Sequence, residues 1–369
     1  MRPKRMMPTK PRSAATGLIA AAAFAAFAPA AAVAATPTAA PLPDDIARHF
    51  VIPHERIDIG GRTLNLHCMG SGERTVLLEA GGSDWSVTWA LVQPLVAKKL
   101  RACAYDRAGL GYSDPAMLPR TPGAIVEDLR ALIVAAKLPT PLILVGHSLG
   151  GFDVKLYAAL YPDDVAGLVL VDPAEERQAE RSRPFLRTKY DPLTLARGEL
   201  LDMAWLGWLL DRYRECARLA GDTPMDPASI AYRRCSDPVR APLGPLIGTE
   251  RQRIQVTPAY QRAQASEILY SIYGNGQGDA VFARLFKPGI FGRKPLIVLT
   301  HGDYDRGDAL AEMDQAAGVY LHRLTARLSH IGVQRTIDGT SHNMQIDKPM
   351  AIVAAIMDVE AKLAAPRPR

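Results

Sequence analysis

Short apolar strand-like segments alternate with longer helical segments along most of this 369-residue chain. Strands that are apolar almost throughout must be buried on both faces, and helices cover the two sides of such a mostly parallel sheet. The first two strand-like segments, which a short glycine-rich turn joins, are candidates for an antiparallel edge. The strand-like segments are residues 62–69, 74–80, 101–106, 141–147, 165–172, 295–301 and 333–338, and the helical ones are about 86–99, 123–137, 149–161 and 349–364.

One interval of more than a hundred residues, between Asp172 and Pro295, breaks the alternation. Its pattern is helical, as in "DPLTLARGELLDMAWLGWLLDRYRECARLAGD", and it contains no clear strand. A chain of this length also exceeds what one hydrophobic core usually supports. The sequence therefore predicts a helical cap, residues 177–290, inserted between two parts of one core, residues 46–176 and 291–369.

The segment "LILVGHSLGG", residues 142–151, contains the pattern G-x-S-x-G with Ser148 at its centre. An apolar strand-like run enters the pattern, and a segment with helical apolar spacing leaves it. A strand, a sharp turn and a helix form a nucleophile elbow, in which Gly146 and Gly150 allow strand and helix to approach closely. The start of the helix would direct the backbone N–H of Leu149 at a developing oxyanion. A glycine-rich turn without chemistry is the alternative.

With this motif in its strand-to-helix context, the chain resembles the α/β-hydrolase family over nearly all of its length outside the cap. The resemblance implies a mostly parallel, eight-stranded α/β sheet with helices on both faces and an inserted helical cap. In that family the catalytic residues follow the chain order serine, acid, histidine. His342, in "DGTSHNMQIDKPM", resembles the histidine of that family's late loop. His301 ends a strand-like segment and is the alternative base.

The acid is less narrowly defined by the sequence. In "PLIVLTHGDYD" a strand, Gly302 and an aspartate three positions later match the family pattern, which favours Asp305. Asp303 is the first alternative, and Asp172, at the end of the preceding strand in "VLVDPAEE", is the second. The acid would accept the imidazole N–H and stabilise the imidazolium that forms when His342 takes the serine proton.

A second oxyanion donor is expected beside the amide of Leu149. The resemblance assigns it to the backbone of Gly82 in "LLEAGGSDWS", although Ala80 stands where many relatives have histidine. That departure leaves the anchoring of the loop undefined. In "YDRAGLGYSD", Asp106 and Arg107 are interpreted as a structural ion pair and turn rather than as catalysts.

The four cysteines are an even number, and their spacing fits no zinc pattern. Disulfides persist in exported proteins. In the α/β-hydrolase family the second and fourth strands are neighbours, so the resemblance implies a Cys68–Cys103 bridge. Cys216 and Cys235 fall on flanking helical segments of the cap and are predicted to form the second bridge. Free buried thiols are the alternative.

The first 35 residues are predicted to be a secretory signal peptide. A basic, acid-free start, "MRPKRMMPTKPR", precedes an alanine-rich apolar stretch and small residues suited to cleavage near Ala35. An uncleaved anchor helix is the alternative, and residues 36–45 are interpreted as a linker. The five positive charges of this segment account for all but one unit of the formal net charge of +6. The remaining chain has no basic pattern that indicates nucleic acid binding.

Together these features predict a secreted or periplasmic serine hydrolase that cleaves a carboxylic ester through an acyl-enzyme and needs no metal or cofactor. No stable membrane insertion is expected once the signal peptide is removed. An apolar helix at residues 200–210 is predicted to pack between cap and core, or else to wall an apolar site. The alternatives are a lactonase, a perhydrolase, a carbon–carbon bond hydrolase and a non-catalytic binding protein. An aminopeptidase or amidase related to proline iminopeptidases is another, for which Glu250 and Glu267 could bind an amine.

Overall fold

The computed structural model describes residues 41–117, 119–274, 282 and 284–365. The predicted signal peptide lies outside these residues. Helix α1 (Asp44–Ala47) begins inside the predicted linker. Leu42 is buried, and its N–H donates a hydrogen bond of 3.0 Å to the carbonyl of Pro242. The packed part of the chain therefore begins before residue 46.

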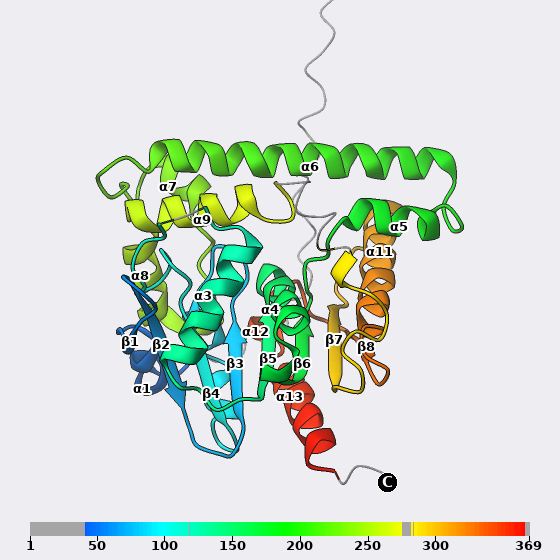
Figure 1. The fold of residues 1–369 in the computed structure, drawn as a ribbon. Coiled ribbons are helices and arrows are strands. Elements are labelled where there is room, and N and C mark those ends of the chain that lie inside the picture. Colours follow the sequence, from blue (N-terminus) through cyan, green and yellow to red (C-terminus); the bar gives the residue numbers. More distant parts are fainter. Residues whose placement is uncertain (1–40, 118, 275–281, 283, 366–369) are drawn as a thin grey trace, which may run out of the picture. The chain divides into compact units, whose positions relative to one another are not determined.

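Eight strands form one sheet in the order β1-β2-β4-β3-β5-β6-β7-β8 (Figure 1). β2 is antiparallel to both of its neighbours, β1 and β4, whereas the other neighbouring strands are parallel. Of the two segments expected at an antiparallel edge, residues 62–69 form the antiparallel strand β2, but residues 74–80 form β3 inside the sheet, parallel to β4 and β5. The strands are β1 (Glu55–Asp58), β2 (Thr63–Met69), β3 (Thr75–Glu79), β4 (Arg101–Tyr105), β5 (Leu142–His147), β6 (Val165–Val171), β7 (Leu296–His301) and β8 (Val333–Ile337).

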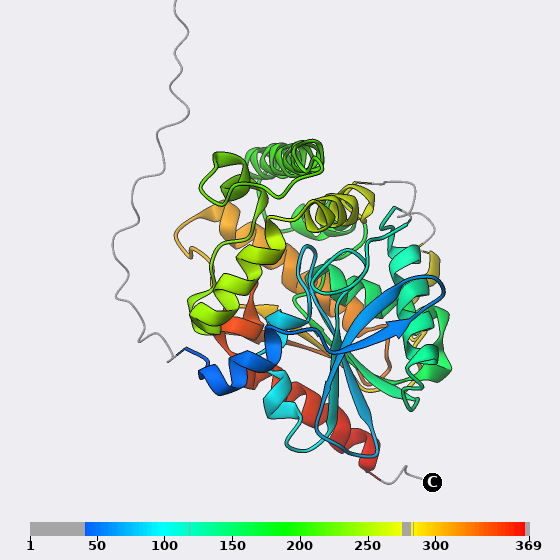
Figure 2. The same cartoon turned by 90° about the vertical axis from the view of Figure 1, so that its left-hand side faces the viewer.

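Helices cover both faces of the sheet, as the nearly continuous apolar strands require (Figures 1 and 2). On one face, residues of α3 and α4 join a core cluster that includes Val126 and Phe152. On the other, α2 and α13 contribute residues such as Val96 and Ile356 to a second cluster. The helices of the core are α2 (Gln93–Val96), α3 (Pro122–Ala135), α4 (Ser148–Leu160), α11 (Ala309–Ala326), α12 (Met344–Asp347) and α13 (Pro349–Ala364).

The described residues between β6 and β7 form helices and no strand. The longest helix is α6, which runs along the top of Figure 1 with α9 below it. Its start is set by Asp191, whose carboxylate accepts hydrogen bonds from the N–H groups of Leu193 and Thr194, and by Pro192 in the first turn. The helices of this cap are α5 (Gln178–Leu186), α6 (Pro192–Leu219), α7 (Ile230–Cys235), α8 (Gly244–Gln255) and α9 (Pro258–Tyr270).

Both predicted disulfides are confirmed. Cys68 on β2 lies directly opposite Cys103 on β4 in the antiparallel register, and the two are bonded. Cys216 of α6 is bonded to Cys235 at the end of α7, so the second bridge joins two cap helices. Among the described residues, no helix has the length and apolar character needed to cross a membrane.

Candidate active site

Ser148 stands at the junction of β5 and α4, at the carboxyl end of a central strand. Its φ angle of 51° lies in the left-handed region, which is uncommon for a residue with a side chain. A Cβ atom on Gly146 would lie 2.4 Å from the carbonyl oxygen of Gly150, and one on Gly150 would lie 2.2 Å from that of Ala80. Both glycines are therefore required for strand, turn and helix to approach this closely.

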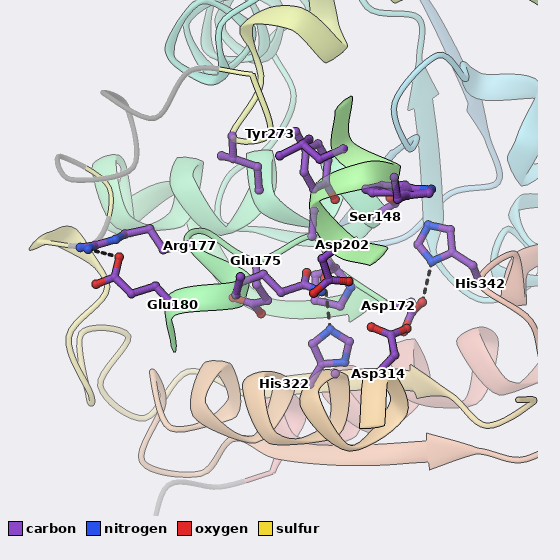
Figure 3. Close-up of a pocket in the computed structure, with 18 of the residues that line it drawn as sticks. Ser148, Asp172, Glu175, Arg177, Glu180, Asp202, Tyr273, Asp314, His322 and His342 are labelled. Atoms are coloured by element: carbon purple, nitrogen blue, oxygen red, sulfur yellow. Dashed lines mark hydrogen bonds and ion pairs between the residues drawn. The ribbon is translucent and has the colours of Figure 1, made fainter. Parts of the chain in front are cut away.

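His342 lies in the loop between β8 and α12, and its Nδ1 atom is 2.5 Å from Oδ2 of Asp172. Figure 3 shows Ser148, His342 and Asp172 together at one end of a pocket. No hydrogen bond joins Ser148 to His342 within the described part of the chain, and such catalytic contacts often tighten only when substrate binds. Serine, histidine and aspartate are thus brought together by the ends of strands β5, β8 and β6.

The carboxylate beside His342 is that of Asp172, not the predicted one of Asp305. Asp305 is exposed in the turn after β7, where its Oδ1 atom accepts a hydrogen bond from the N–H of Gly307 at 2.9 Å. Asp303 is also exposed. Asp172, in contrast, follows directly after β6, which pairs with β5 in the sheet. β6 thus places the carboxylate of Asp172, the second alternative from the sequence, one strand away from Ser148, whereas Asp305 and Asp303 do not contact His342 among the described residues.

The environment of Asp172 keeps its carboxylate ionised. Burial by itself would raise its pKa, but the hydrogen bonds from His301 and His342 hold the pKa of Asp172 well below its usual range. The Nδ1 atom of His301 is 2.8 Å from the same Oδ2 atom. His301, the predicted alternative base, therefore contacts the acid instead of standing apart from it.

His147, which precedes Ser148, supports the loop that carries His342. Burial, followed by the nearby charge of His342, lowers the pKa of His147 to about 3, so its ring is neutral. Its Nε2 atom donates to the carbonyl of His342 at 2.8 Å, and its Nδ1 atom is 3.4 Å from the amide nitrogen of Gln345. This neutral histidine thereby fixes the backbone at His342.

The loop that contains Gly82 is anchored by a buried arginine. Arg107 donates hydrogen bonds to the carbonyls of Ala80 and Gly81, at 2.6 and 2.7 Å. It also forms ion pairs with Glu79 of β3 and Glu267 of cap helix α9. The predicted structural role of Arg107 is correct, but its partners are these two glutamates and not Asp106.

Glu267 joins the same loop to the cap by accepting a hydrogen bond from the N–H of Ser83 at 3.1 Å. Gly82 itself packs against the helix that follows Ser148, since a Cβ atom at Gly82 would lie 3.4 Å from Cδ2 of Leu149. Both predicted oxyanion donors therefore belong to segments in direct contact. The anchor was not identified from the sequence, because Arg107 and Glu267 are 160 positions apart.

The pocket beside Ser148 has a volume of about 940 Å³. Its apolar wall comes from the cap side and includes Trp205, Leu206, Ile272 and Tyr273. Polar residues line other parts of the same space, among them Asp202 and Asp314 (Figure 3). The segment at residues 200–210 thus walls the pocket in part, although Leu200, Met203 and Trp208 are exposed. The prediction that it packs between cap and core is therefore wrong for these three side chains.

Comparison with models of protein families identifies the family to which this chain belongs. The model of the alpha/beta hydrolase fold family matches residues 74–349, which is more than half of the chain. The chain therefore belongs to the alpha/beta hydrolase fold family, and this membership supports a hydrolase.

Two curated relatives match a shorter region. The uncharacterized protein YqjL of Bacillus subtilis is 35% identical over 108 residues, which are 29% of this chain and 43% of that protein. The (lyso)-N-acylphosphatidylethanolamine lipase of Mus musculus is 34% identical over 106 residues, which are 27% of this chain and 31% of that protein. The matched region spans less than half the length of either relative.

Solved structures resemble this chain over a greater length. A putative lipase from Acinetobacter baumannii has a TM-score of 0.56 and 18% identity, with 89% of this chain and 99% of that one covered. A thermophilic esterase from Thermogutta terrifontis has a TM-score of 0.54 and 18% identity, with 85% and 100% covered. At this level of identity the likeness concerns the fold.

Proposed function

We propose that this protein is a serine hydrolase in which Ser148, His342 and Asp172 form the catalytic triad. Ser148 attacks the carbonyl carbon of the substrate while His342 accepts its proton and later returns it to the leaving group. Asp172 orients the imidazole and stabilises the imidazolium. The single observation that carries this proposal is the 2.5 Å contact between His342 Nδ1 and Asp172 Oδ2 beside the strained Ser148.

The tetrahedral oxyanion would be held by the amides of Leu149 and Gly82. Leu149 is the second residue of α4, where backbone N–H groups have no partner inside the helix. The packing of Gly82 against Leu149, and the anchoring of its loop by Arg107, support a preorganised pair of donors. Water then hydrolyses the acyl-enzyme with His342 as the base.

A carboxylic ester with an apolar acyl or aromatic group is the substrate class that we favour. The cap wall formed by Trp205, Leu206 and Tyr273 supports it. The two glutamates considered for binding an amine are engaged elsewhere. Glu267 pairs with Arg107, and Glu250 accepts a hydrogen bond from Tyr112 and pairs with Arg253. Two disulfides also support the proposal that the enzyme works outside the reducing cytoplasm.

A substrate with a free amine is the second candidate, as in an aminopeptidase. Asp202 of α6 and Asp314 of α11 both line the pocket. Burial, followed by the neighbouring charge of Asp314, raises the pKa of Asp202. Burial and the charge of Asp172 raise the pKa of Asp314, against the effect of His301. A cationic group between these two carboxylates would stabilise their ionised forms. This observation favours a test with aminoacyl substrates.

Labelling with a fluorophosphonate probe tests the proposal. We expect the wild type to be labelled, and Ser148→Ala to lose labelling and about 10⁵-fold in kcat for p-nitrophenyl esters. Ser71→Ala, at an exposed position in the loop between β2 and β3, is the matched control and should behave like wild type. Unlabelled wild type, or equal labelling of Ser148→Ala, would refute a serine hydrolase. A panel of p-nitrophenyl esters and aminoacyl anilides then separates the two substrate classes.

A further inference from the structure

One carboxylate oxygen serves two histidines at this site. Oδ2 of Asp172 is 2.5 Å from Nδ1 of His342 and 2.8 Å from Nδ1 of His301. The other oxygen, Oδ1, accepts a hydrogen bond of 3.2 Å from the backbone N–H of His301. Asp172 therefore divides its charge between the ring proposed as the base and a second ring that the reaction does not use.

The pairing of β6 with β7 brings His301 next to Asp172. His301 is the last residue of β7, which is parallel to β6, and the N–H of Asp172 donates to the carbonyl of Leu299 at 2.8 Å. The amide of Gln315 donates to the carbonyl of His301 at 2.7 Å and holds the strand end against α11. The His301 side chain is about a quarter exposed and lines the same pocket as Ser148. Backbone hydrogen bonds therefore fix the position of His301, and its partly exposed imidazole can exchange protons with solvent.

The charged groups around His301 favour its protonated form. Its hydrogen bond to Asp172 raises the pKa of His301 most, and the charges of Asp172, Asp314 and Asp303 add to this against the opposing effect of burial. On the far side of the strand, His322 of α11 bonds with Thr300 and the carbonyl of Pro173. The imidazole of His301 thus faces three carboxylates, one after β6, one on α11 and one in the loop after β7.

We propose that His301 is a positioning residue that sets the protonation of His342 by sharing the Oδ2 atom of Asp172. The inference rests on the proposed triad. When His301 is protonated, it takes part of the negative charge of Asp172 and repels a second imidazolium. Both effects destabilise the protonated form of His342, so His342 loses its proton at lower pH than it would beside an unshared carboxylate. The shared oxygen thereby extends activity toward acidic pH.

The dependence of kcat/KM on pH tests this role, measured with a soluble p-nitrophenyl ester. His301→Asn keeps a donor N–H toward Asp172 but carries no charge. We expect the acidic limb of its profile to move up by about 0.5 to 1 pH unit, so that activity near pH 5.5 falls three- to tenfold. On the alkaline plateau it should stay within about threefold of wild type. His330→Asn, an exchange at an exposed histidine, should leave the limb unchanged.

An unmoved limb with a lower plateau would show that His301 is merely structural and would overturn the inference. His301→Gln, made in parallel, keeps the test available if the asparagine variant does not fold, and thermal melting checks both. NMR titration of labelled histidine follows the pKa of His342 without turnover. A raised His342 pKa in the variant supports the inference even if the protein cleaves no ester. Absence of ester cleavage would contradict only the proposed function. An unchanged His342 pKa overturns the inference whatever the activity.

Discussion

The two walls of the pocket are held in different ways. On the core wall, Ser148, Asp172 and His342 follow the ends of β5, β6 and β8, whose register is fixed by backbone hydrogen bonds. On the cap wall, Trp205 belongs to a 28-residue helix in which few residues are buried, and its side chain is 52% exposed. The sheet therefore positions the residues of the proposed triad, whereas a lightly packed helix forms the surface against which we propose that the substrate packs. Substitutions on the two walls should change different kinetic constants.

The two walls also differ in the environment of their charged side chains. On the core wall, Asp172 accepts hydrogen bonds from His301 and His342, and these hold its pKa below the usual range against the effect of burial. The outer face of α6 instead presents apolar side chains to solvent, including Leu200 and Met203, beside ordinary surface ion pairs such as Asp211 with Arg214. The buried carboxylate of the proposed triad thus lies on the core wall, where backbone pairing fixes the strand ends.

The largest expected effect is on the core wall. Asp172→Asn should lower kcat by about 10⁴-fold with little change in KM, because the neutral amide neither fixes the tautomer of His342 nor stabilises its imidazolium. Steady-state kinetics on a p-nitrophenyl ester measures the effect. Asp305→Asn is the matched control and should remain within about twofold of wild type. A large loss in Asp305→Asn with little loss in Asp172→Asn would reverse our assignment of the acid.

A second prediction concerns the link between the walls. Glu267→Ala removes a fully buried partner of Arg107, and the free energy of unfolding should fall by about 3 to 5 kcal/mol, because a buried charge loses its partner. Urea denaturation followed by circular dichroism measures the change. Asp211→Ala, which breaks a pair with Arg214 at the exposed surface of α6, should cost less than about 1 kcal/mol. Equal losses in both variants would mean that burial of the Arg107 cluster does not matter to stability.

The smallest expected effect is on the cap wall. Trp205→Ala removes an aromatic side chain that lines the pocket and packs edge-on against Tyr273. KM for an aromatic or long-chain ester should rise about five- to tenfold while kcat stays within about twofold, since uniform binding is lost. Trp208 is equally exposed on the same helix but lies outside the pocket lining, so Trp208→Ala should leave KM unchanged. A fall in kcat alone for Trp205→Ala would contradict the division between the walls.

The sequence by itself determined those features that depend on local patterns. Apolar strand runs and their alternation with helices predicted the layered sheet, and G-x-S-x-G between a strand and a helix placed Ser148 at a strained turn. The loop at His342 and the Cys68–Cys103 pair followed from the family resemblance, whereas the Cys216–Cys235 pair followed from the position of both residues on flanking helical segments of the cap. Each is set either by neighbouring residues or by a strand order that the whole family shares.

Only the tertiary structure distinguished the three candidate aspartates, because they satisfy similar local patterns and the acid that we propose depends on which strand end lies beside Ser148. Asp172 qualifies since β6 pairs with β5, whereas Asp305 turns into solvent beyond β7. The bonds from Arg107 to Glu267, and from Asp172 to His301, join residues more than a hundred positions apart. No local pattern encodes such contacts, because they arise from the packing of strands and helices that the chain brings together only when it folds.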